Sequence, residues 1–262
     1  EAMVARAHNV IGTGPAIGEK AAEPIRALGA EPLEVPLVNA SLNPLAMMGS
    51  LAKLRQVLRE RRPDVLISYT IKPVILGALA GRAPCVQKIV SLITGAGYAF
   101  TGGAELKRLL SKTAAILLYR LALSRSDEVV FQNPDDEALF RELRLIAPGR
   151  EARRTNGSGI DLDFFFPVPL PPKPAFLMIA RLLKDKGIPE FVEAARRLKA
   201  EHPEVPIALV GRLDPSPDSL SQAELDSLIT CGIDFKGELT DVRPAIGECS
   251  VYVLPSYREG TP

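Results

Sequence analysis

The sequence is poor in metal-binding residues and has no long apolar run. Its 262 residues include three cysteines, and these lie too far apart for the ligand spacing of a zinc site: Cys85, Cys231 and Cys249. Two histidines, His8 and His202, exclude a histidine-rich metal site. Because no run of about 18 apolar residues occurs, the sequence predicts no membrane-spanning helix. The few cysteines favour a reducing compartment, where thiols serve as small apolar groups.

A strong charge of either sign is also missing. The 32 lysines and arginines nearly balance the 31 acidic residues, and the formal net charge is +1. Proteins dedicated to nucleic acid are usually strongly basic, so this balance argues against a nucleic-acid partner. The hydrophobic content of 47% and the charged content of 24% are ordinary for a globular protein. The length is sufficient for two domains.

Strand-like and helix-like segments alternate along the first part of the chain. Short apolar or β-branched runs, typical of strands, occur at 32–38, 64–69, 88–94 and 128–132. Helix-like stretches lie between or after them at 44–61, 73–82, 105–124 and 134–144. This alternation predicts a mainly parallel sheet whose two faces are covered by helices.

A proline-rich segment interrupts the alternation. Residues 166–174 read FPVPLPPKP, with five prolines in nine positions, which excludes a helix and favours a stiff, extended connector. Strand-like runs then resume at 175–180, 205–210, 233–236 and 250–254, and helix-like stretches at 189–201, 219–231 and 241–248. We therefore expect an N-terminal α/β domain over 1–165, a hinge over 166–174, and a C-terminal α/β domain over 175–262.

Both ends have the character of internal sequence. Residues 1–7 are typical of the end of a helix, and Thr261 and Pro262 are typical of an N-cap and a first helical residue. We expect the first strand of the N-terminal domain to be missing and the C-terminal domain to be incomplete.

Charged residues follow two strands of the second domain. Arg181 and Lys186 come after its first strand, and Glu259 and Gly260 come after its last. In open α/β sheets ligands bind beyond the carboxyl ends of the strands, and fixed cations suit a diphosphate. On spacing alone, a solvated basic loop and an acid that complements a helix dipole explain these residues as well.

Two more loops contain glycine at the end of a strand. Gly211, with Asp214 near it, ends the run 205–210, where a glycine permits a tight turn or the close approach of a ligand. The loop 94–98, TGAGY, lies at the ligand edge of the first domain, although an ordinary turn explains it too. Asp241 is better explained as an N-cap than as a ligand-binding residue.

A third glycine cluster resembles a dinucleotide fingerprint. Gly12, Gly14 and Gly18 form G-x-G-x-x-x-G, but Pro15 lies within the loop and Pro24 interrupts the helix that should follow. An NAD-dependent oxidoreductase is therefore a weakly supported alternative.

The stretch 105–124 combines a wide apolar face with basic residues. The basic residues are Lys107, Arg108, Lys112, Arg120 and, just beyond, Arg125. Such a helix can lie on an anionic membrane surface. A helix that packs on its own sheet and exposes its lysines to solvent is the alternative.

Together these motifs resemble family 4 of the retaining GT-B glycosyltransferases. The resemblance covers nearly the whole chain and rests on 179–198 (IARLLKDKGIPEFVEAARRL), 241–262 (DVRPAIGECSVYVLPSYREGTP), 156–165 (NGSGIDLDFF) and 131–136 (FQNPDD). Two further segments, 68–77 (SYTIKPVILG) and 93–102 (ITGAGYAFTG), resemble the bacterial branch that builds surface polysaccharides and related glycans. The implied fold is α/β of the GT-B type, in which two Rossmann-like domains with mainly parallel sheets face each other across a cleft.

The resemblance implies roles for matching residues. Arg181 and Lys186 match the pair that grips the donor diphosphate and stabilises the leaving nucleoside diphosphate. Glu259 matches the first glutamate of the E-x7-E motif, which contacts the donor sugar, and we count these three residues as catalytic. The other donor-binding residues implied are Gly211, Ser256, Tyr257, Gly260 and Thr261. The acceptor-side residues implied are Lys72, Thr94, Gly95, Gly97 and Tyr98.

Two departures from the family pattern lie at Ala96 and at the start of the sequence, and the second of them leads us to expect that these 262 residues are poorly active or inactive. Ala96 occupies a position that a larger apolar residue usually fills. The second glutamate of the E-x7-E motif would fall beyond Pro262, and the glycine-rich loop after the first strand would precede residue 1.

The function implied is transfer of a hexose or N-acetylhexosamine from a UDP-sugar to a polyprenyl-diphosphate-linked glycan acceptor, with retention, in surface polysaccharide biosynthesis. No metal or other cofactor is required, because Arg181 and Lys186 take the place of a divalent cation. We expect a cytoplasmic protein, peripheral on the inner face of the cytoplasmic membrane through 105–124. A sugar-nucleotide epimerase and a non-catalytic sugar-nucleotide-binding protein stay open as alternatives, although the epimerase would want further acid–base carboxylates and histidines.

Overall fold

The structure is a computed structural model that describes residues 2–15, 17–35, 44–82, 86–95, 106–214, 219–257 and 259. At 44–46 and 106–112 only the backbone is described. Four residues expected in the site lie outside the described residues: Gly97, Tyr98, Gly260 and Thr261. The described chain forms two compact units, one within residues 1–158 and one within 159–259. The boundary thus falls before the proline-rich segment.

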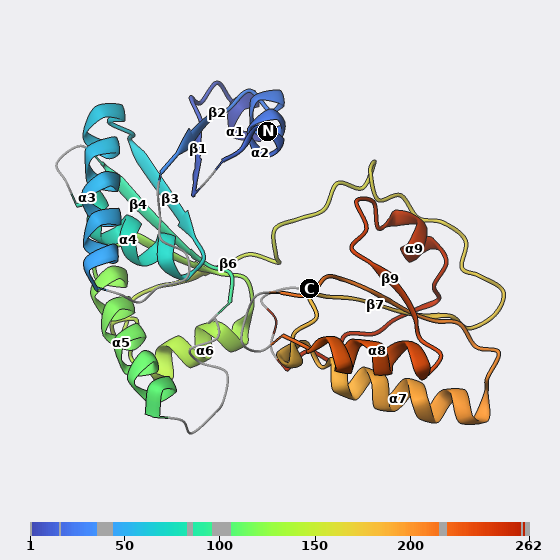
Figure 1. Cartoon of the computed structure of the whole chain (residues 1–262). Helices are drawn as coiled ribbons and strands as arrows, with labels where there is room; N and C mark the ends of the chain where they lie inside the picture. Colours follow the sequence, from blue (N-terminus) through green and yellow to red (C-terminus); the bar gives the residue numbers. More distant parts are fainter. Residues whose placement is uncertain are drawn as a thin grey trace. The chain divides into compact units, whose positions relative to one another are not determined.

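The first unit is α/β with parallel strands (Figure 1). Its strands are β1 (Ile11–Gly14), β2 (Glu31–Glu34), β3 (Val65–Tyr69), β4 (Lys88–Ile93), β5 (Glu128–Phe131) and β6 (Arg153–Arg154). Its helices are α1 (Ala2–Ala5), α2 (Glu19–Ala27), α3 (Pro44–Arg61), α4 (Ile71–Gly81), α5 (Leu106–Leu123) and α6 (Pro134–Glu142). The strands form a sheet in the order β3-β4-β5-β6 and a separate pair, β1-β2, and every pairing is parallel.

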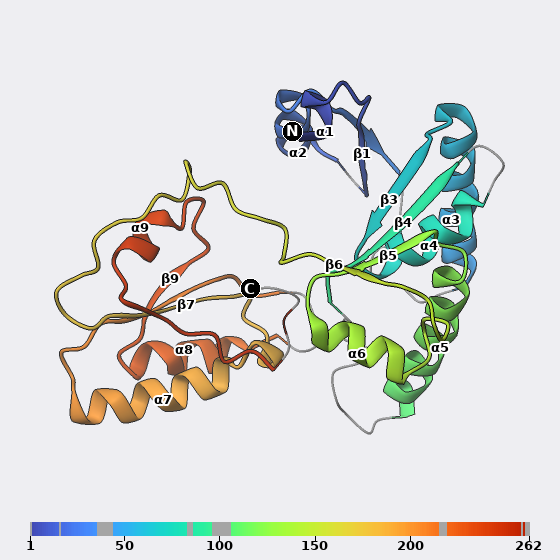
Figure 2. The same ribbon diagram turned by 180° about the vertical axis from the view of Figure 1, so that it is seen from behind.

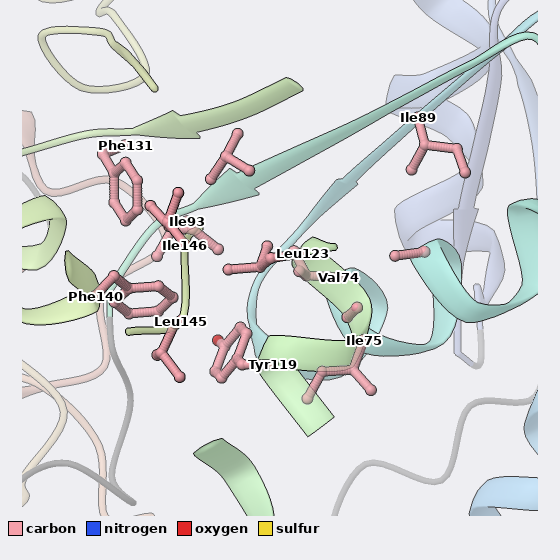
Figure 3. Close-up of a cluster of buried hydrophobic side chains, with 13 residues drawn as sticks. Val74, Ile75, Ile89, Ile93, Tyr119, Leu123, Phe131, Phe140, Leu145 and Ile146 are labelled. Carbon is pink, nitrogen blue, oxygen red and sulfur yellow. The ribbon is translucent and has the colours of Figure 1, made fainter. Parts of the chain in front are cut away.

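Aromatic side chains pack in the core between this sheet and its helices (Figure 3). Tyr119 of α5 and Phe131 of β5 each meet Phe140 of α6 edge-to-face, with ring centroids 5.1 and 5.3 Å apart. Ile89 and Ile93 of β4 are buried in the same cluster. Full burial of side chains of this size supplies most of the stability of such a layer.

The N-terminal segment corrects one expectation. Gly12 and Gly14 lie within β1, not in a loop after it, and Gly18 is the N-cap of α2. The expectation that Pro24 interrupts the helix is wrong, because α2 continues through it to Ala27. Ile25 of α2 packs on Gly12, where a Cβ would come within 3.3 Å of its side chain. Tertiary packing thus offsets the one hydrogen bond that a proline removes.

The second unit is also a parallel α/β sheet, seen from both sides in Figures 1 and 2. Its strands are β7 (Phe176–Ile179), β8 (Ile207–Val210), β9 (Asp234–Gly237) and β10 (Val251–Tyr252), in the order β10-β7-β8-β9. Its helices are a short 3-10 helix (Lys184–Lys186), α7 (Ile188–Glu201), α8 (Gln222–Thr230) and α9 (Arg243–Gly247). The strands and helices expected from the alternation are confirmed in both units, with ends that shift by a few residues.

Alternate residues of β7 serve the two faces of this sheet. Met178 packs with Phe191 of α7 in one cluster, whereas Leu177 packs with Ala245 of α9 in another. The expectation that Asp241 is an N-cap is wrong, because Val242 is the N-cap of α9; Asp241 lies one residue earlier, and its Oδ1 accepts a hydrogen bond from the Arg243 N–H at 3.0 Å. In the described part of the chain, no helix is both long and apolar enough to cross a bilayer.

Candidate functional site

The donor residues expected in the second unit gather at one edge of its sheet. Because β7, β8 and β10 are parallel, their carboxyl ends point to the same edge. The loop after β7 carries Arg181 and Lys186, the loop after β8 begins at Gly211, and the segment after β10 carries Glu259. The parallel topology therefore brings together residues that lie up to 78 positions apart, from 181 to 259.

Lys186 and Glu259 are in direct contact at this edge. The Lys186 Nζ donates a hydrogen bond to the Glu259 Oε1 at 2.7 Å. The two side chains are 19% and 27% exposed, so solvent only partly screens the pair. The resemblance implies that Lys186 grips a phosphate and Glu259 contacts a sugar, and the structure shows that the two side chains meet.

Backbone contacts hold the segment after β10 against the short 3-10 helix. The Tyr257 N–H donates to the Asp185 carbonyl oxygen at 3.1 Å, and the Ser256 hydroxyl approaches the same oxygen at 3.5 Å. The Tyr257 hydroxyl donates to the Glu190 carboxylate, and this bond raises the pKa of Tyr257. Ser256 and Tyr257 therefore position the segment that carries Glu259.

Gly187 permits this close approach. Its φ is 75°, which is in the left-handed region, and a Cβ there would lie 2.3 Å from the Pro255 carbonyl oxygen. Any larger residue would push Pro255 away from the end of the 3-10 helix. The glycine between Lys186 and α7 thus sets the distance between the Lys186 and Glu259 loops.

Arg181 is also paired with a carboxylate. Its Nη1 lies 3.0 Å from the Asp214 Oδ2, and the two side chains are 56% and 14% exposed. The Ser219 hydroxyl accepts a bond from the Asp214 N–H at 3.1 Å and donates to the Leu182 carbonyl oxygen at 3.3 Å. The loop after β8 is thereby tied to the loop that carries Arg181.

Gly211 serves packing at this edge. A Cβ at this position would lie 1.9 Å from the Ala180 carbonyl oxygen. No side chain fits between the ends of β7 and β8, so the glycine allows two backbones to meet. The sequence left open a tight turn or the close approach of a ligand, and the structure adds a third reason for this glycine, the packing of one backbone on another.

Sequence reasoning assigned no role to three residues at this edge. Asp214 holds Arg181, Glu190 accepts from Tyr257, and the Tyr252 hydroxyl donates to the Ile179 carbonyl oxygen at 3.1 Å. Burial raises the pKa of Tyr252. Each contact joins residues at least 33 positions apart, so no local spacing could reveal it.

Three of the residues expected on the acceptor side, which the structure describes, also share a sheet edge. Lys72 lies in the first turn of α4, directly after β3, whereas Thr94 and Gly95 follow the neighbouring parallel strand β4. Burial lowers the pKa of Lys72. Thr70, just before α4, has φ 67° and ψ 162°, a conformation that costs a residue other than glycine about 1–3 kcal/mol. Such strain is typical of ligand-binding segments.

Known proteins match both units. The family model for the glycosyl transferase 4-like domain matches residues 1–157, and the model for glycosyl transferases group 1 matches residues 173–262. The chain belongs to the glycosyl transferase 4-like family. The resemblance inferred from the residues is thereby confirmed.

Two curated relatives of this chain come from bacteria. One is the N,N'-diacetylbacillosaminyl-diphospho-undecaprenol alpha-1,3-N-acetylgalactosaminyltransferase of Campylobacter jejuni, 29% identical over 91% of the chain. The other is the UDP-Gal:alpha-D-GlcNAc-diphosphoundecaprenol alpha-1,3-galactosyltransferase of Escherichia coli, 25% identical over 87% of the chain. The chain spans 65% and 61% of the length of these two relatives.

Solved structures confirm the fold. A glycosyltransferase from Rickettsia africae matches with a TM-score of 0.66 at 17% identity, over 97% of this chain and 66% of the other. The sucrose-phosphate synthase of Thermosynechococcus elongatus matches with a TM-score of 0.66 at 18% identity, over 97% of this chain and 73% of the other. At such identities the likeness establishes the fold alone, which is the GT-B fold of two parallel α/β units.

Proposed function

We propose that this protein transfers a hexose or N-acetylhexosamine from a UDP-sugar to a polyprenyl-diphosphate-linked glycan acceptor, with retention of anomeric configuration. The observation that carries the proposal is the meeting of Lys186 and Glu259 at 2.7 Å at the carboxyl edge of the second sheet, where Lys186 shares the loop after β7 with Arg181. The names of the two relatives support the choice of sugar and acceptor, because both describe alpha-1,3-transferases that act on a diphospho-undecaprenol-linked sugar.

Donor binding at this edge is an exchange of partners. A diphosphate carries more negative charge than a carboxylate and forms strong charge-assisted hydrogen bonds with ammonium and guanidinium groups. As the donor enters, Lys186 moves its hydrogen bond from Glu259 to a phosphate oxygen. The released Glu259 then accepts hydrogen bonds from hydroxyl groups of the donor sugar.

Retention follows from a front-face reaction. The acceptor hydroxyl oxygen bonds to the anomeric carbon on the face from which the diphosphate departs, and the leaving phosphate oxygen takes the hydroxyl proton. Arg181 and Lys186 stabilise the charge that develops on the leaving diphosphate. We propose that they do so without a divalent cation, so transfer is expected to persist in the presence of a chelator.

The acceptor lies on the first unit in this proposal. Lys72 and the start of the loop after β4, at Thr94 and Gly95, share the carboxyl edge of neighbouring strands. A lysine there suits the diphosphate of a lipid-linked acceptor. Helix α5 would rest on the inner face of the cytoplasmic membrane, where such acceptors are held, and Leu117 and Leu121 on it are 59% and 45% exposed.

A titration of UDP tests the donor site. Arg181→Ala and Lys186→Ala should each weaken UDP binding by about 1–3 kcal/mol, the range for hydrogen bonds to charged groups. Lys184→Ala is the matched control, because Lys184 belongs to the same 3-10 helix but pairs with Glu224 at 3.1 Å. Calorimetry that finds equal UDP affinity in all four proteins would reject the site.

Transfer itself needs a separate assay. The protein is incubated with a panel of UDP-sugars and a polyprenyl-diphosphate-linked sugar, and the product linkage is determined by NMR. An alpha-linked product from an alpha-linked donor is expected. An inverted linkage contradicts the retaining mechanism, whereas UDP binding without any product identifies a non-catalytic binder.

A further inference from the structure

A pocket in the first unit is lined by arginine and leucine side chains. It has a volume of about 510 Å³ and lies between α3, α4 and α5. We call it the arginine pocket, and the described residues that line it are Leu51, Arg55, Arg59, Leu79, Arg82, Leu121 and Arg125. Its volume is typical of small-molecule sites, and no acidic residue is among these seven.

Helix-end contacts account for two of the four arginines. Arg55 donates to the Leu79 carbonyl oxygen at 3.3 Å, and Arg125 donates to the Leu121 carbonyl oxygen at 3.4 Å, near the ends of α4 and α5. Cations are stabilised at such helix ends. Arg59 and Arg82, both exposed, have neither a carboxylate nor a carbonyl partner within the described ranges. These two guanidinium groups are therefore available to bind an anion.

The arginine pocket is separate from the expected acceptor residues. In a βαβ unit each helix runs back against its strands, so the ends of α4 and α5 lie beside the amino ends of β4 and β5. Lys72 and Thr94 lie at the opposite, carboxyl edge of the same sheet. A ligand of the arginine pocket is thus not the reacting group of the acceptor.

Exposed leucines favour a membrane lipid over a soluble anion. Leu121 lines the arginine pocket and is 45% exposed, and Leu117, one turn earlier on α5, is 59% exposed. Apolar side chains beside unpaired arginines suit the boundary between lipid headgroups and acyl chains. The 18 residues of α5 span about 27 Å. If α5 lies flat on a bilayer, its start, which follows β4, and its end, which borders the arginine pocket, both face the same membrane surface.

We propose that the arginine pocket binds the phosphate of an anionic phospholipid headgroup, with Arg59 and Arg82 as its ligands and Leu117 and Leu121 inserted beside it. Two guanidinium groups on neighbouring helices can hold a phosphate from two sides. The choice of a lipid rests on the proposed function, which places the acceptor in a membrane.

Vesicle binding tests this proposal without any transfer assay. The chain is mixed with vesicles of phosphatidylcholine, with or without phosphatidylglycerol, and the bound fraction is measured by flotation. Binding should require phosphatidylglycerol, and Arg59→Gln with Arg82→Gln should lower the partition coefficient roughly 25-fold, since each basic residue near an anionic surface contributes about fivefold. Binding that does not depend on phosphatidylglycerol overturns the proposal.

A matched double variant separates the arginine pocket from general charge. Arg6→Gln with Arg144→Gln removes the same charge from two exposed arginines of the same unit, and a loss below about threefold is expected. Equal losses in the two double variants overturn the proposal. UDP binding should be the same in every variant, so a chain that binds vesicles but not UDP refutes the proposed function and leaves the lipid site standing.

Two more measurements distinguish a lipid from a soluble phosphate. Leu117→Gln should weaken vesicle binding roughly fivefold, because one partly inserted leucine is lost, whereas a site for a soluble anion would not respond. Glycerol 3-phosphate, the headgroup without its chains, should not displace the vesicles. If it binds tightly, and Arg59→Gln with Arg82→Gln abolishes only that binding, the arginine pocket is a soluble-phosphate site. Circular dichroism of each variant verifies the fold.

Discussion

The donor edge of the second unit and the arginine pocket of the first hold their cations in opposite ways. Arg181 and Lys186 each contact a carboxylate, at 3.0 and 2.7 Å. Arg59 and Arg82 line a pocket in which no described residue is acidic. The cations of the donor edge are thus paired with carboxylates, whereas Arg59 and Arg82 have no such partner among the described residues.

This difference predicts two kinds of binding. A paired cation has little net field, and a ligand must displace the carboxylate, so only a group of strong and well-placed charge is bound. Unpaired arginines attract anions over a longer range and with less discrimination, and salt screens that attraction. We therefore expect selectivity at the donor edge and general affinity for anionic surfaces at the arginine pocket.

The largest effect should come from breaking the backbone approach beneath the donor edge. Gly211→Ala places a Cβ 1.9 Å from the Ala180 carbonyl oxygen, so the ends of β7 and β8 must separate. We expect the free energy of unfolding to fall by roughly 3 kcal/mol. Urea titration followed by circular dichroism measures this loss.

A glycine in open space is the control. A Cβ on Gly49 of α3 would meet nothing within 4 Å, and alanine is the better helix former. Gly49→Ala should therefore leave the protein as stable or make it slightly more stable. If Gly211→Ala behaves like Gly49→Ala, the close approach at the donor edge is not needed.

The next largest effect is expected in UDP binding, and it distinguishes the role of Glu259 from that of Lys186. Glu259→Gln removes the charge that occupies Lys186, so UDP should bind roughly tenfold more tightly, a gain of about 1.4 kcal/mol. A UDP-sugar should gain less than UDP, because Glu259 is proposed to contact the sugar. Calorimetry with both ligands measures the difference. Weaker binding of UDP to Glu259→Gln would contradict the exchange of partners.

The sequence predicts which residues share an edge, but not which of them touch. Arg181 and Glu259 follow parallel strands, and that topology suffices to place them together. The Lys186–Glu259 contact spans 73 positions and depends on how two loops fold, which no local pattern encodes. The prediction that Pro24 interrupts the helix failed for the same reason, because the packing of Ile25 on Gly12 maintains α2 through the proline.

The arginine pocket could not be read from the sequence. Its arginines come from α3, from the residue after α4 and from the turn after α5, and each is an ordinary basic residue near the end of a helix. Only the packing of three helices brings them around one cavity. Local periodicity predicts helices and strands, but it does not predict which charged side chains the tertiary structure brings together.

The smallest effect is expected at the ion pair between Lys184 and Glu224, which lies next to the donor edge. Ser221 and Glu224 form a capping box at the start of α8, and Glu224 also pairs with Lys184 of the 3-10 helix at 3.1 Å. Bonds from the Ser221 N–H and hydroxyl, with Lys184, lower the pKa of Glu224 from 4.5 to about 2. Ser221→Ala removes one of these bonds and should lower the Tm by roughly 3 °C at neutral pH.

The pH dependence of that difference identifies its cause. A carboxylate whose pKa is lowered in the folded state adds stability above its unfolded pKa, here 4.5, and loses it as the pH falls toward about 2. The pKa of Glu224 is lowered less in Ser221→Ala. The gap in Tm between the two proteins, measured by calorimetry, should therefore narrow below pH 4.5. Ser227→Ala, an exposed change in the same helix, should show no such narrowing. If the gap in Tm between Ser221→Ala and the unmodified protein does not change with pH, the serine caps α8 but does not help to keep Glu224 ionised beside Lys184. The Lys184–Glu224 pair would then not belong to the set of paired charges that includes Lys186 and Glu259.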